Sequence, residues 1–327
     1  MRIERFKRQI AAFGDLGQQR IVAERVGIVG GGGLGCFVGQ SLVNLGVRRA
    51  VMVDHDTLTE TNRNRWVLGF PADIGAYKVD LIRRYMLAVD PAAEVVAIKE
   101  NLRSRAALAE LMKCSTIFGC VDNDGARLIL TELCAAYRIL YIDCASEIIP
   151  PKADSPLDFG GRVVVARPGQ FCLFCAGELD SEEAKMALED SSVKAARVAH
   201  GYGLGSEVES PSVVSLNGVV ANLAVTEFMA MVARLREPAF KLTYRGMRGV
   251  VVSSQAERSL ACYTCNVLNG IRDEVDIFRY ESLTAERLVG HRPFEGDPGR
   301  QRIEGNGLRP NQACCGVESP GAERCPP

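Results

Sequence analysis

The chain has 327 residues, of which 47% are hydrophobic, and a formal net charge of -1. A chain of this length and composition can bury a sizeable core, as one large domain or two small ones. The nearly balanced charge gives no support to bulk binding of nucleic acid or to a polyanionic tail.

Two features of the sequence indicate a protein that does not span a membrane. The N-terminal stretch MRIERFKRQI is charged where a secretory signal would be apolar. The longest apolar run, residues 212–235, is interrupted by polar side chains such as Asn217 and Glu227. We therefore expect a cytoplasmic protein without a membrane span.

Strands and helices alternate through the first half of the chain. Residues 1–24 predict one or two helices. After them we expect strands at 25–30, 49–54, 93–98, 115–120 and 139–144, with helices at 33–46, 75–89 and 124–137. The predicted strands are continuous apolar runs, which favours a parallel sheet covered on both faces. The predicted fold class is α/β, with a Rossmann-like, doubly wound and mostly parallel sheet.

The pattern changes after residue 160. Residues 161–169 predict a strand, 181–198 a charged helix, 212–235 a long helix and 241–254 two more strands. This order favours a mixed or antiparallel extension of the sheet. From about residue 284 the chain is rich in Gly, Pro, Glu and Arg, which predicts a flexible tail over 284–327.

A glycine-rich turn follows the first predicted strand. Gly30, Gly32 and Gly35 give the spacing G-x-G-x-x-G, which allows a tight turn, close approach to a phosphate and packing of the next helix on the strand. Asp54 ends the second predicted strand, where a carboxylate can bind a ribose. The pattern predicts an adenine nucleotide and leaves open which one.

Three cationic residues and an asparagine lie where the second predicted strand and the helix after it reach the edge of the sheet at which ligands bind. Asn62, Arg63 and Arg65 follow the second strand, and Lys78 begins the next helix. Such groups can neutralise a triphosphate and the charge of departing pyrophosphate. Taken alone, each cation is more often a solvated surface residue. Together they favour ATP over a nicotinamide cofactor.

An acid marks the end of the fourth predicted strand. Asp122 lies at the ligand edge, with Asn123 and Asp124 beside it. A carboxylate there can bind the Mg²⁺ that accompanies ATP. The alternative is that Asp122 caps the following helix, and Asp124 is also a candidate for that cap.

Taken in order, these segments resemble one enzyme family. The stretches RFKRQ, GGGGLG, VDHDTLTETNRNR, GAYK and CVDND, with two cysteine pairs, are similar over about residues 4–270 to the ThiF/MoeB/HesA family of ubiquitin-activating-enzyme-like adenylyltransferases. The resemblance implies ATP-dependent adenylation of the C-terminal carboxylate of a small ubiquitin-like or sulfur-carrier protein ending in Gly-Gly, with release of pyrophosphate. It also implies a homodimer and the cofactors ATP, Mg²⁺ and Zn²⁺.

The resemblance also assigns roles by position. It implies that the glycines line the phosphates, Asp54 the ribose and Asp122 the Mg²⁺, and that Arg8 enters the site of the partner subunit. The residues it places on the phosphate chain are Asn62, Arg65 and Lys78. The catalytic set is then Arg8, Arg65, Lys78 and Asp122. The domain expected to carry the chemistry is 25–283, preceded by a helical segment at 1–24.

The cysteines fall into groups. Cys172 with Cys175 and Cys262 with Cys265 form two C-x-x-C pairs, which are typical of a structural zinc site, although a redox pair or unrelated thiols would show the same spacing. The resemblance favours zinc. We expect core positions for the five cysteines inside apolar segments, Cys36, Cys114, Cys120, Cys134 and Cys144.

One departure from the family concerns the thiol that would receive the activated acyl group. Many members have a further cysteine in the crossover loop, here about 176–211, but no cysteine lies between Cys175 and Cys262. Either a separate thiol-bearing conjugating protein or an amine accepts the acyl group, or a thiol comes from elsewhere in the chain. The tail cysteines, Cys314, Cys315 and Cys325, are candidates by elimination. The loop, with His200 and Tyr202, is either a clamp for the partner's tail or an ordinary exposed loop.

Three other functions compete with the leading one. The carboxylate could belong to a peptide or be carried by a tRNA, although the chain lacks the basic surplus of an RNA-binding protein. A NAD-dependent oxidoreductase is disfavoured by Arg65, Lys78 and Asp122 together. A non-catalytic scaffold subunit is disfavoured by the apparent completeness of the nucleotide site.

Overall fold

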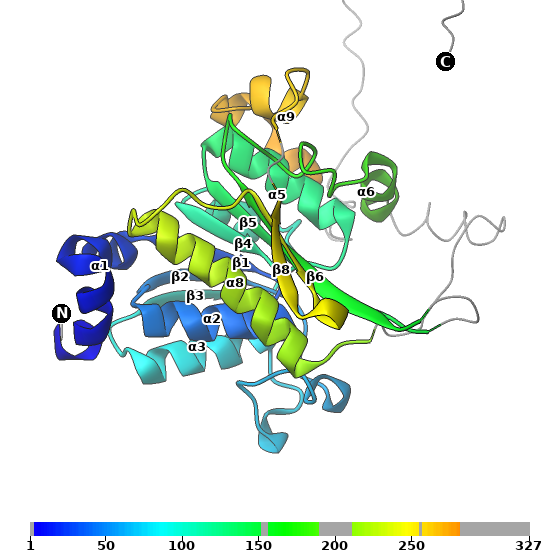
Figure 1. Ribbon diagram of the computed structural model, residues 1–327. Helices are drawn as coiled ribbons and strands as arrows, with labels where there is room; N and C mark the ends of the chain where they lie inside the picture. Colours follow the sequence, from blue (N-terminus) through cyan, green and yellow to red (C-terminus); the bar gives the residue numbers. More distant parts are fainter. Residues whose placement is uncertain (1–2, 152–155, 190–210, 255–256, 282–327) are drawn as a thin grey trace, which may run out of the picture. The chain divides into compact units, whose positions relative to one another are not determined.

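A mixed eight-stranded sheet forms the centre of the computed structural model (Figure 1). The structure describes residues 3–151, 156–189, 211–254 and 257–281. The predicted tail at 284–327 and, within the predicted crossover loop, His200 and Tyr202 lie outside the described residues, as do the three tail cysteines.

The strand order explains how one sheet combines two pairing modes. From edge to edge the order is β3-β2-β1-β4-β5-β6-β7-β8. The first five strands pair in parallel and the last three pair antiparallel. Their bounds are β1 (Arg25–Val29), β2 (Arg49–Val53), β3 (Glu94–Ile98), β4 (Thr116–Gly119), β5 (Leu140–Ile149), β6 (Asp158–Ala166), β7 (Lys241–Arg245) and β8 (Val250–Ser254). The predicted α/β fold with a mixed extension is confirmed.

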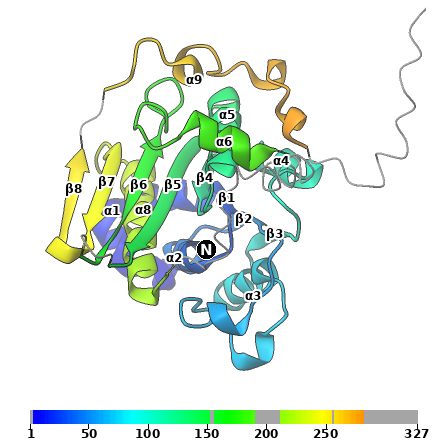
Figure 2. The ribbon, with the colours of Figure 1, turned by 90° about the vertical axis from the view of Figure 1, so that its right-hand side faces the viewer.

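Helices lie on both faces of the parallel part of the sheet. Figure 2 shows α2, α3 and α8 on one side and α4 and α5 on the other. The bounds of the helices are α1 (Ile3–Ala23), α2 (Gly33–Leu45), α3 (Lys78–Val89), α4 (Arg105–Leu111), α5 (Asp124–Tyr137), α6 (Ser181–Leu188), α8 (Val214–Val232) and α9 (Tyr263–Asn266). Short 3-10 turns are η1 (Glu60–Asn62), η2 (Pro71–Asp73), η3 (Gly246–Arg248), η4 (Arg272–Glu274) and η5 (Ile277–Tyr280).

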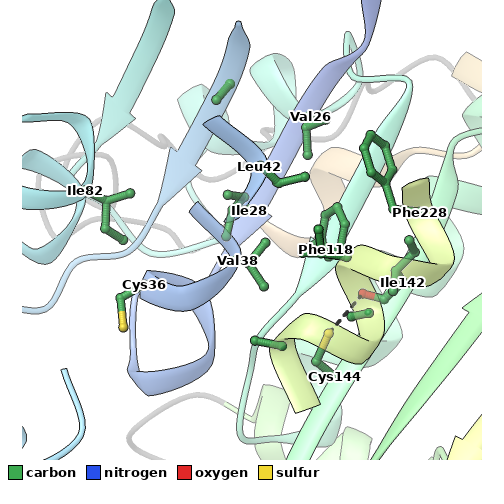
Figure 3. Packing of buried hydrophobic residues seen from close by; sticks show 14 of the residues in the cluster. Val26, Ile28, Cys36, Val38, Leu42, Ile82, Phe118, Ile142, Cys144 and Phe228 are labelled. Atoms are coloured by element: carbon green, nitrogen blue, oxygen red, sulfur yellow. Dashed lines mark hydrogen bonds between the residues drawn. The ribbon is translucent and has the colours of Figure 1, made fainter. Parts of the chain in front are cut away.

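Two buried clusters explain why the central parallel strands are apolar at most positions. Ile28 of β1 belongs to the cluster under α2 and α8, whereas its neighbour Val29 belongs to the cluster under α4 and α5. Figure 3 shows the first cluster, where Phe118 of β4 meets Phe228 of α8 edge to face at 5.7 Å. Because successive side chains of a strand point to opposite faces, a strand covered on both sides needs apolar residues throughout.

α8 is the one described helix with the length and apolarity to cross a membrane. Half of its 18-residue apolar stretch is buried inside the fold, and the helix packs against α2, β5 and β6. Two of its polar residues, Asn217 and Glu227, are themselves buried at 2% exposure. α8 therefore serves as a core helix of this sheet.

Several elements differ from their predicted bounds. Gly14, at φ 75° and ψ 167°, separates two helical segments within α1. The helix predicted from residue 75 begins at Lys78, because Gly75 adopts φ 90°. The strand predicted to end at 144 continues to Ile149, because β5 pairs antiparallel with the whole of β6. α4 was not predicted. Of the charged helix predicted at 181–198, the described part ends at Leu188.

Candidate nucleotide cleft and thiolate cluster

A cleft of about 1890 Å³ opens at the carboxyl ends of the parallel strands. Residues that follow β1, β2, β3 and β4 line it, together with the second half of β5 and part of α6. In open parallel sheets this edge is where ligands bind. Pockets for one small molecule usually have about 300 to 1000 Å³. The cleft is therefore larger than a pocket for one small molecule.

The glycines of the predicted turn have three different environments. Gly30 adopts φ 92°, and a Cβ there would overlap the carbonyl oxygen of Cys120. Gly32 faces open space in the cleft, with no atom within 4 Å of a Cβ built on it. At Gly35 a Cβ would overlap the carbonyl oxygen of Gly30. Gly30 and Gly32 line the cleft, whereas Gly35 is buried and allows α2 to pack on β1.

These environments predict different effects for two alanine variants. Gly35→Ala is expected to lower the free energy of unfolding by about 2 to 4 kcal/mol, because its methyl group would meet rigid backbone. Gly32→Ala is expected to keep the stability and to weaken ATP binding, because its methyl group would occupy the space that a phosphate needs. Urea unfolding and ATP titration measure the two quantities. Equal stability of both variants would contradict the prediction.

Hydrogen bonds hold the backbone of Gly31 on both sides. Its N–H donates to Asp54 Oδ2 at 2.5 Å, and its carbonyl oxygen accepts from Trp66 Nε1 at 2.6 Å. Asp54 Oδ1 also accepts from the Asp56 N–H at 2.7 Å. Burial raises the pKa of Asp54, although the backbone hydrogen bonds from Asp56 and Gly31 oppose the shift. Trp66, which sequence reasoning would place only in the core, thus fixes the glycine turn.

The predicted cation cluster is brought to this cleft in part. Lys78 is buried at 6% exposure, lines the cleft and donates from Nζ to Asp56 Oδ2 at 2.8 Å. Arg65 and Asn62 also line the cleft. Arg63 pairs instead with Glu60 at 2.6 Å.

Arg65 is held by its own loop. Its guanidinium donates to the Thr61 carbonyl oxygen at 2.8 Å and to Asn64 Oδ1 at 3.2 Å. Lys78, by contrast, lies at the start of α3, with its backbone N–H bound to the Asp56 carbonyl oxygen at 3.0 Å. Lysine is rarely buried without a partner, and Lys78 follows that rule because its ammonium pairs with Asp56.

Asp122 lies at the end of β4 with its side chain exposed in the cleft. It is not the cap of α5, because the cap is Asn123, whose Oδ1 accepts from the Ala126 N–H at 2.9 Å. Asp124 is the first residue of the helix and does not cap it either. Both capping interpretations of the sequence are therefore wrong. The Asp122 carboxylate accepts one hydrogen bond, at 3.1 Å from the Asn123 amide.

Arg8 is placed away from this cleft. It is exposed on α1 and is not among the residues that line the cleft of its own chain. Its predicted role in a partner subunit remains a prediction.

Two polar residues of the cleft escaped sequence reasoning. Ser146 of β5 donates to Asn217 Oδ1 of α8 at 2.8 Å, and the Asn217 amide donates to Ser212 at 3.1 Å. The Asn217 amide also lies where a Cβ on Gly33 would be. The available signal was an asparagine in an otherwise apolar helix, because a buried amide needs partners.

The two cysteine pairs meet in one cluster. Cys172 and Cys175 follow β6, and Cys262 and Cys265 lie at α9. All four sulfur atoms lie within 4.8 Å of one another, with pairs at 3.5 and 3.8 Å. A tetrahedral Zn²⁺ with bonds of about 2.3 Å needs sulfur atoms about 3.8 Å apart. Hydrogen bonding from Cys265 lowers the pKa of Cys172, and the same hydrogen bond raises the pKa of Cys265.

The other described thiols mostly occupy the core, as expected. Cys36, Cys114, Cys134 and Cys144 are buried. Burial raises the pKa of Cys36 to about 11 and that of Cys114 to about 12, so both are poor nucleophiles. Cys120 is the exception, because it is half-buried and lines the cleft.

Comparison with known proteins identifies the class. Residues 6–266 match the ThiF family, and the chain belongs to that family. Molybdopterin-synthase adenylyltransferase of Escherichia coli (strain K12) is 26% identical over 239 residues, which are 72% of this chain and 84% of that protein. Adenylyltransferase and sulfurtransferase uba4 of Aspergillus niger is 32% identical over 130 residues, 39% of this chain and 27% of that protein. These relatives support the predicted enzyme class, an ATP-dependent adenylyltransferase.

Solved structures agree in fold. Escherichia coli MccB with ATP has a TM-score of 0.61 at 21% identity and covers 80% of this chain and 74% of its own. The same enzyme in complex with N-formylated MccA has a TM-score of 0.62 at 21% identity. At this identity the likeness concerns the fold alone.

Proposed function

We propose that this protein adenylates the C-terminal carboxylate of a small ubiquitin-like or sulfur-carrier protein. The observation that carries the proposal is one cleft that is lined by the glycine turn, Lys78 and Asp122 and also by the second half of β5 and part of α6. The glycine turn, Lys78 and Asp122 suit ATP, and the walls from β5 and α6 can hold the extended tail that brings a carboxylate to the α-phosphate.

The chemistry requires orientation and neutralisation of charge more than a protein nucleophile. The substrate carboxylate attacks the α-phosphorus, the bond to the β-phosphate oxygen breaks, and pyrophosphate leaves with its electron pair. In this proposal Gly30, Gly32 and the N-terminus of α2 bind the phosphates, while Asp54 binds the ribose. Asn62, Arg65 and Lys78 neutralise the charge that grows on pyrophosphate. No general base is needed, because the carboxylate is already ionised near neutral pH.

The donor set of the cleft fits Mg²⁺. Asp122 presents a carboxylate that is neither buried nor used as a helix cap, and Mg²⁺ typically binds one or two carboxylates together with phosphate oxygens. When bound there, the ion would screen the phosphate charge. The cysteine cluster lines no part of this cleft, and we propose that it binds Zn²⁺ as a structural element.

The partners follow from the same chemistry. We assign the protein to the cytoplasm and to a homodimer in which Arg8 serves the cleft of the partner subunit, as an arginine finger does in phosphoryl transfer. Because no cysteine lies between Cys175 and Cys262, we propose that the acyl-adenylate is passed to a thiol-bearing protein, to an amine or to a thiol elsewhere in this chain. A peptide carboxylate is the second candidate, since the structural neighbour MccB has been solved with the peptide MccA in several forms.

The test is ATP–pyrophosphate exchange by the purified protein with Mg²⁺. It is run alone, with small proteins ending in Gly-Gly, and with the same proteins lacking the two glycines. Exchange that needs an intact Gly-Gly end supports the proposal. Exchange with short peptides but with no carrier protein supports the second candidate. No exchange from a folded, ATP-binding protein contradicts both.

Lys78→Met is expected to lower this exchange roughly a hundredfold, because the variant removes a buried cation from the phosphate end of the cleft. Lys99→Met is the matched control. Lys99 also pairs with an aspartate, Asp80 at 2.7 Å, but is not among the residues that line the cleft. Wild-type exchange in a folded Lys78→Met protein would refute the role of Lys78.

A further inference from the structure

Asp143 is a buried carboxylate for which the proposed chemistry gives no role. It lies in β5 with an exposed fraction of 0%, where an unpaired charge would be very costly. It accepts a hydrogen bond from the Tyr141 hydroxyl at 2.9 Å and forms ion pairs with two guanidinium groups, those of Arg127 and Arg162. Both arginines line the cleft. Asp143 therefore anchors two cations at the wall of the nucleotide site.

Arg127 connects this anchor to the turn that carries Asp122. Its Nη2 donates to the Val121 carbonyl oxygen at 3.0 Å, and its Nη1 donates to Asp124 Oδ1 at 2.7 Å. Its Nε lies 3.5 Å from Asp143 Oδ1. Val121 immediately precedes Asp122 and Asp124 follows it by two residues, so one guanidinium holds the turn on both sides. The planar guanidinium donates both hydrogen bonds at once, and a lysine ammonium cannot span the two acceptors. Nε has no hydrogen-bond partner, so its contact with Asp143 is an ion pair alone.

The same turn is also joined to α6. The second oxygen of Asp124 accepts from the Asp180 N–H at 2.9 Å, and Asp180 caps α6. A Cβ on Gly125 would lie 2.9 Å from the Ala187 side chain, so α6 packs directly on the start of α5. The other anchored arginine, Arg162, reaches the segment before α6 through Glu178 at 2.5 Å. The arrangement fixes the turn against both β5 and α6.

We infer that Arg127, braced by the buried carboxylate of Asp143, is a positioning residue that sets the orientation of Asp122 toward Mg²⁺ and ATP. The inference rests on the proposed magnesium role of Asp122. Asp122 itself is exposed, and its one described hydrogen bond is to its neighbour Asn123. Its orientation therefore depends on the backbone of the turn, which Arg127 holds.

The test is the ratio of two ATP dissociation constants of the full chain, one in excess EDTA and one in Mg²⁺, measured by titration calorimetry. We expect Asp122→Asn to remove most of the Mg²⁺ dependence and Arg127→Met to lower the ratio roughly fivefold. In the double variant, Arg127→Met is expected to lower the ratio no further, because its effect passes through Asp122. A purely structural role would not produce this dependence.

Arg236→Met is the matched control for lost stability. Arg236 binds a buried carboxylate, Glu227, through two hydrogen bonds, and neither residue lines the cleft. This variant is expected to unfold more easily and to keep the wild-type ratio. Arg127→Lys is the second variant, which keeps the charge near Asp143 and is expected to give a ratio between those of the wild type and Arg127→Met.

Two results would overturn the inference, and they differ in what they leave standing. Suppose that Asp122→Asn lowers the ratio while Arg127→Met, or Arg127→Lys if the methionine variant does not fold, keeps the wild-type value. The inference then fails and the magnesium role stands. A wild-type ratio in Asp122→Asn overturns the magnesium role and the inference with it.

Discussion

Asp122→Asn is expected to lower ATP–pyrophosphate exchange about a thousandfold. Asn123 already caps α5, so the Asp122 carboxylate is not needed to begin that helix. The side chain is exposed, and the substitution leaves its size unchanged, so the fold should tolerate it. What the variant removes is the negative charge that would bind Mg²⁺ beside the phosphates. Exchange measured at saturating carrier protein separates this loss from weaker binding of the carrier.

The matched control is Glu274→Gln, which neutralises another exposed carboxylate, one that is not among the residues lining the cleft. It is expected to keep wild-type exchange. If Asp122→Asn melts at the wild-type temperature and exchanges pyrophosphate as fast as the wild type, the assignment of Asp122 is wrong. Partial rescue of the variant by Mn²⁺ would support a direct metal contact, because Mn²⁺ takes the same oxygen and amide ligands.

The parallel half of the fold was predictable because its sequence signals are local. Mostly apolar strands such as 25–29 and 116–119 begin at polar residues, and a glycine stands at or just after the end of each. The same local signals predict that Gly30, Asp54 and Asp122 meet at one sheet edge, since each follows a parallel strand. The distances between these three residues depend on the order in which the strands pair in the sheet.

The remainder depends on contacts between distant segments. The extension of β5 to Ile149 is driven by pairing with β6, and nothing within 145–149 alone distinguishes a strand from a loop. Likewise, the sequence indicates a core position for Trp66 but not the hydrogen bond that its indole donates to the Gly31 carbonyl oxygen. The ion pairs of Asp143 join α5, β5 and β6, so neither spacing nor composition could indicate them.

The cysteine pairs show both situations. Each C-x-x-C spacing was visible in the sequence, but Cys172 and Cys262 are 90 residues apart, and only the fold brings their sulfur atoms to 3.5 Å. The four-residue helix α9, which carries Cys265, is too short to be stable alone. Its attachment to the segment after β6 therefore depends on the cluster, and a bound metal would stabilise that attachment.

Cys262→Ser is accordingly expected to abolish stoichiometric zinc and to lower the melting temperature by about 10 °C or more, for a loss on the order of 5 kcal/mol. Zinc per chain is measured by atomic absorption and unfolding by calorimetry, with and without a strong chelator. Cys114→Ala is the matched control, because Cys114 is buried but lies outside the cluster. It should keep one zinc ion per chain and lose only about 1 kcal/mol.

The zinc prediction can also be separated from the catalytic one. Since none of the four cysteines lines the cleft, a chelated chain that remains folded at low temperature should still bind ATP. Loss of ATP binding before any loss of structure would show instead that the metal contributes to nucleotide binding. A wild-type protein that contains no zinc, and whose melting temperature a chelator leaves unchanged, would show that the four thiols hold α9 by packing alone.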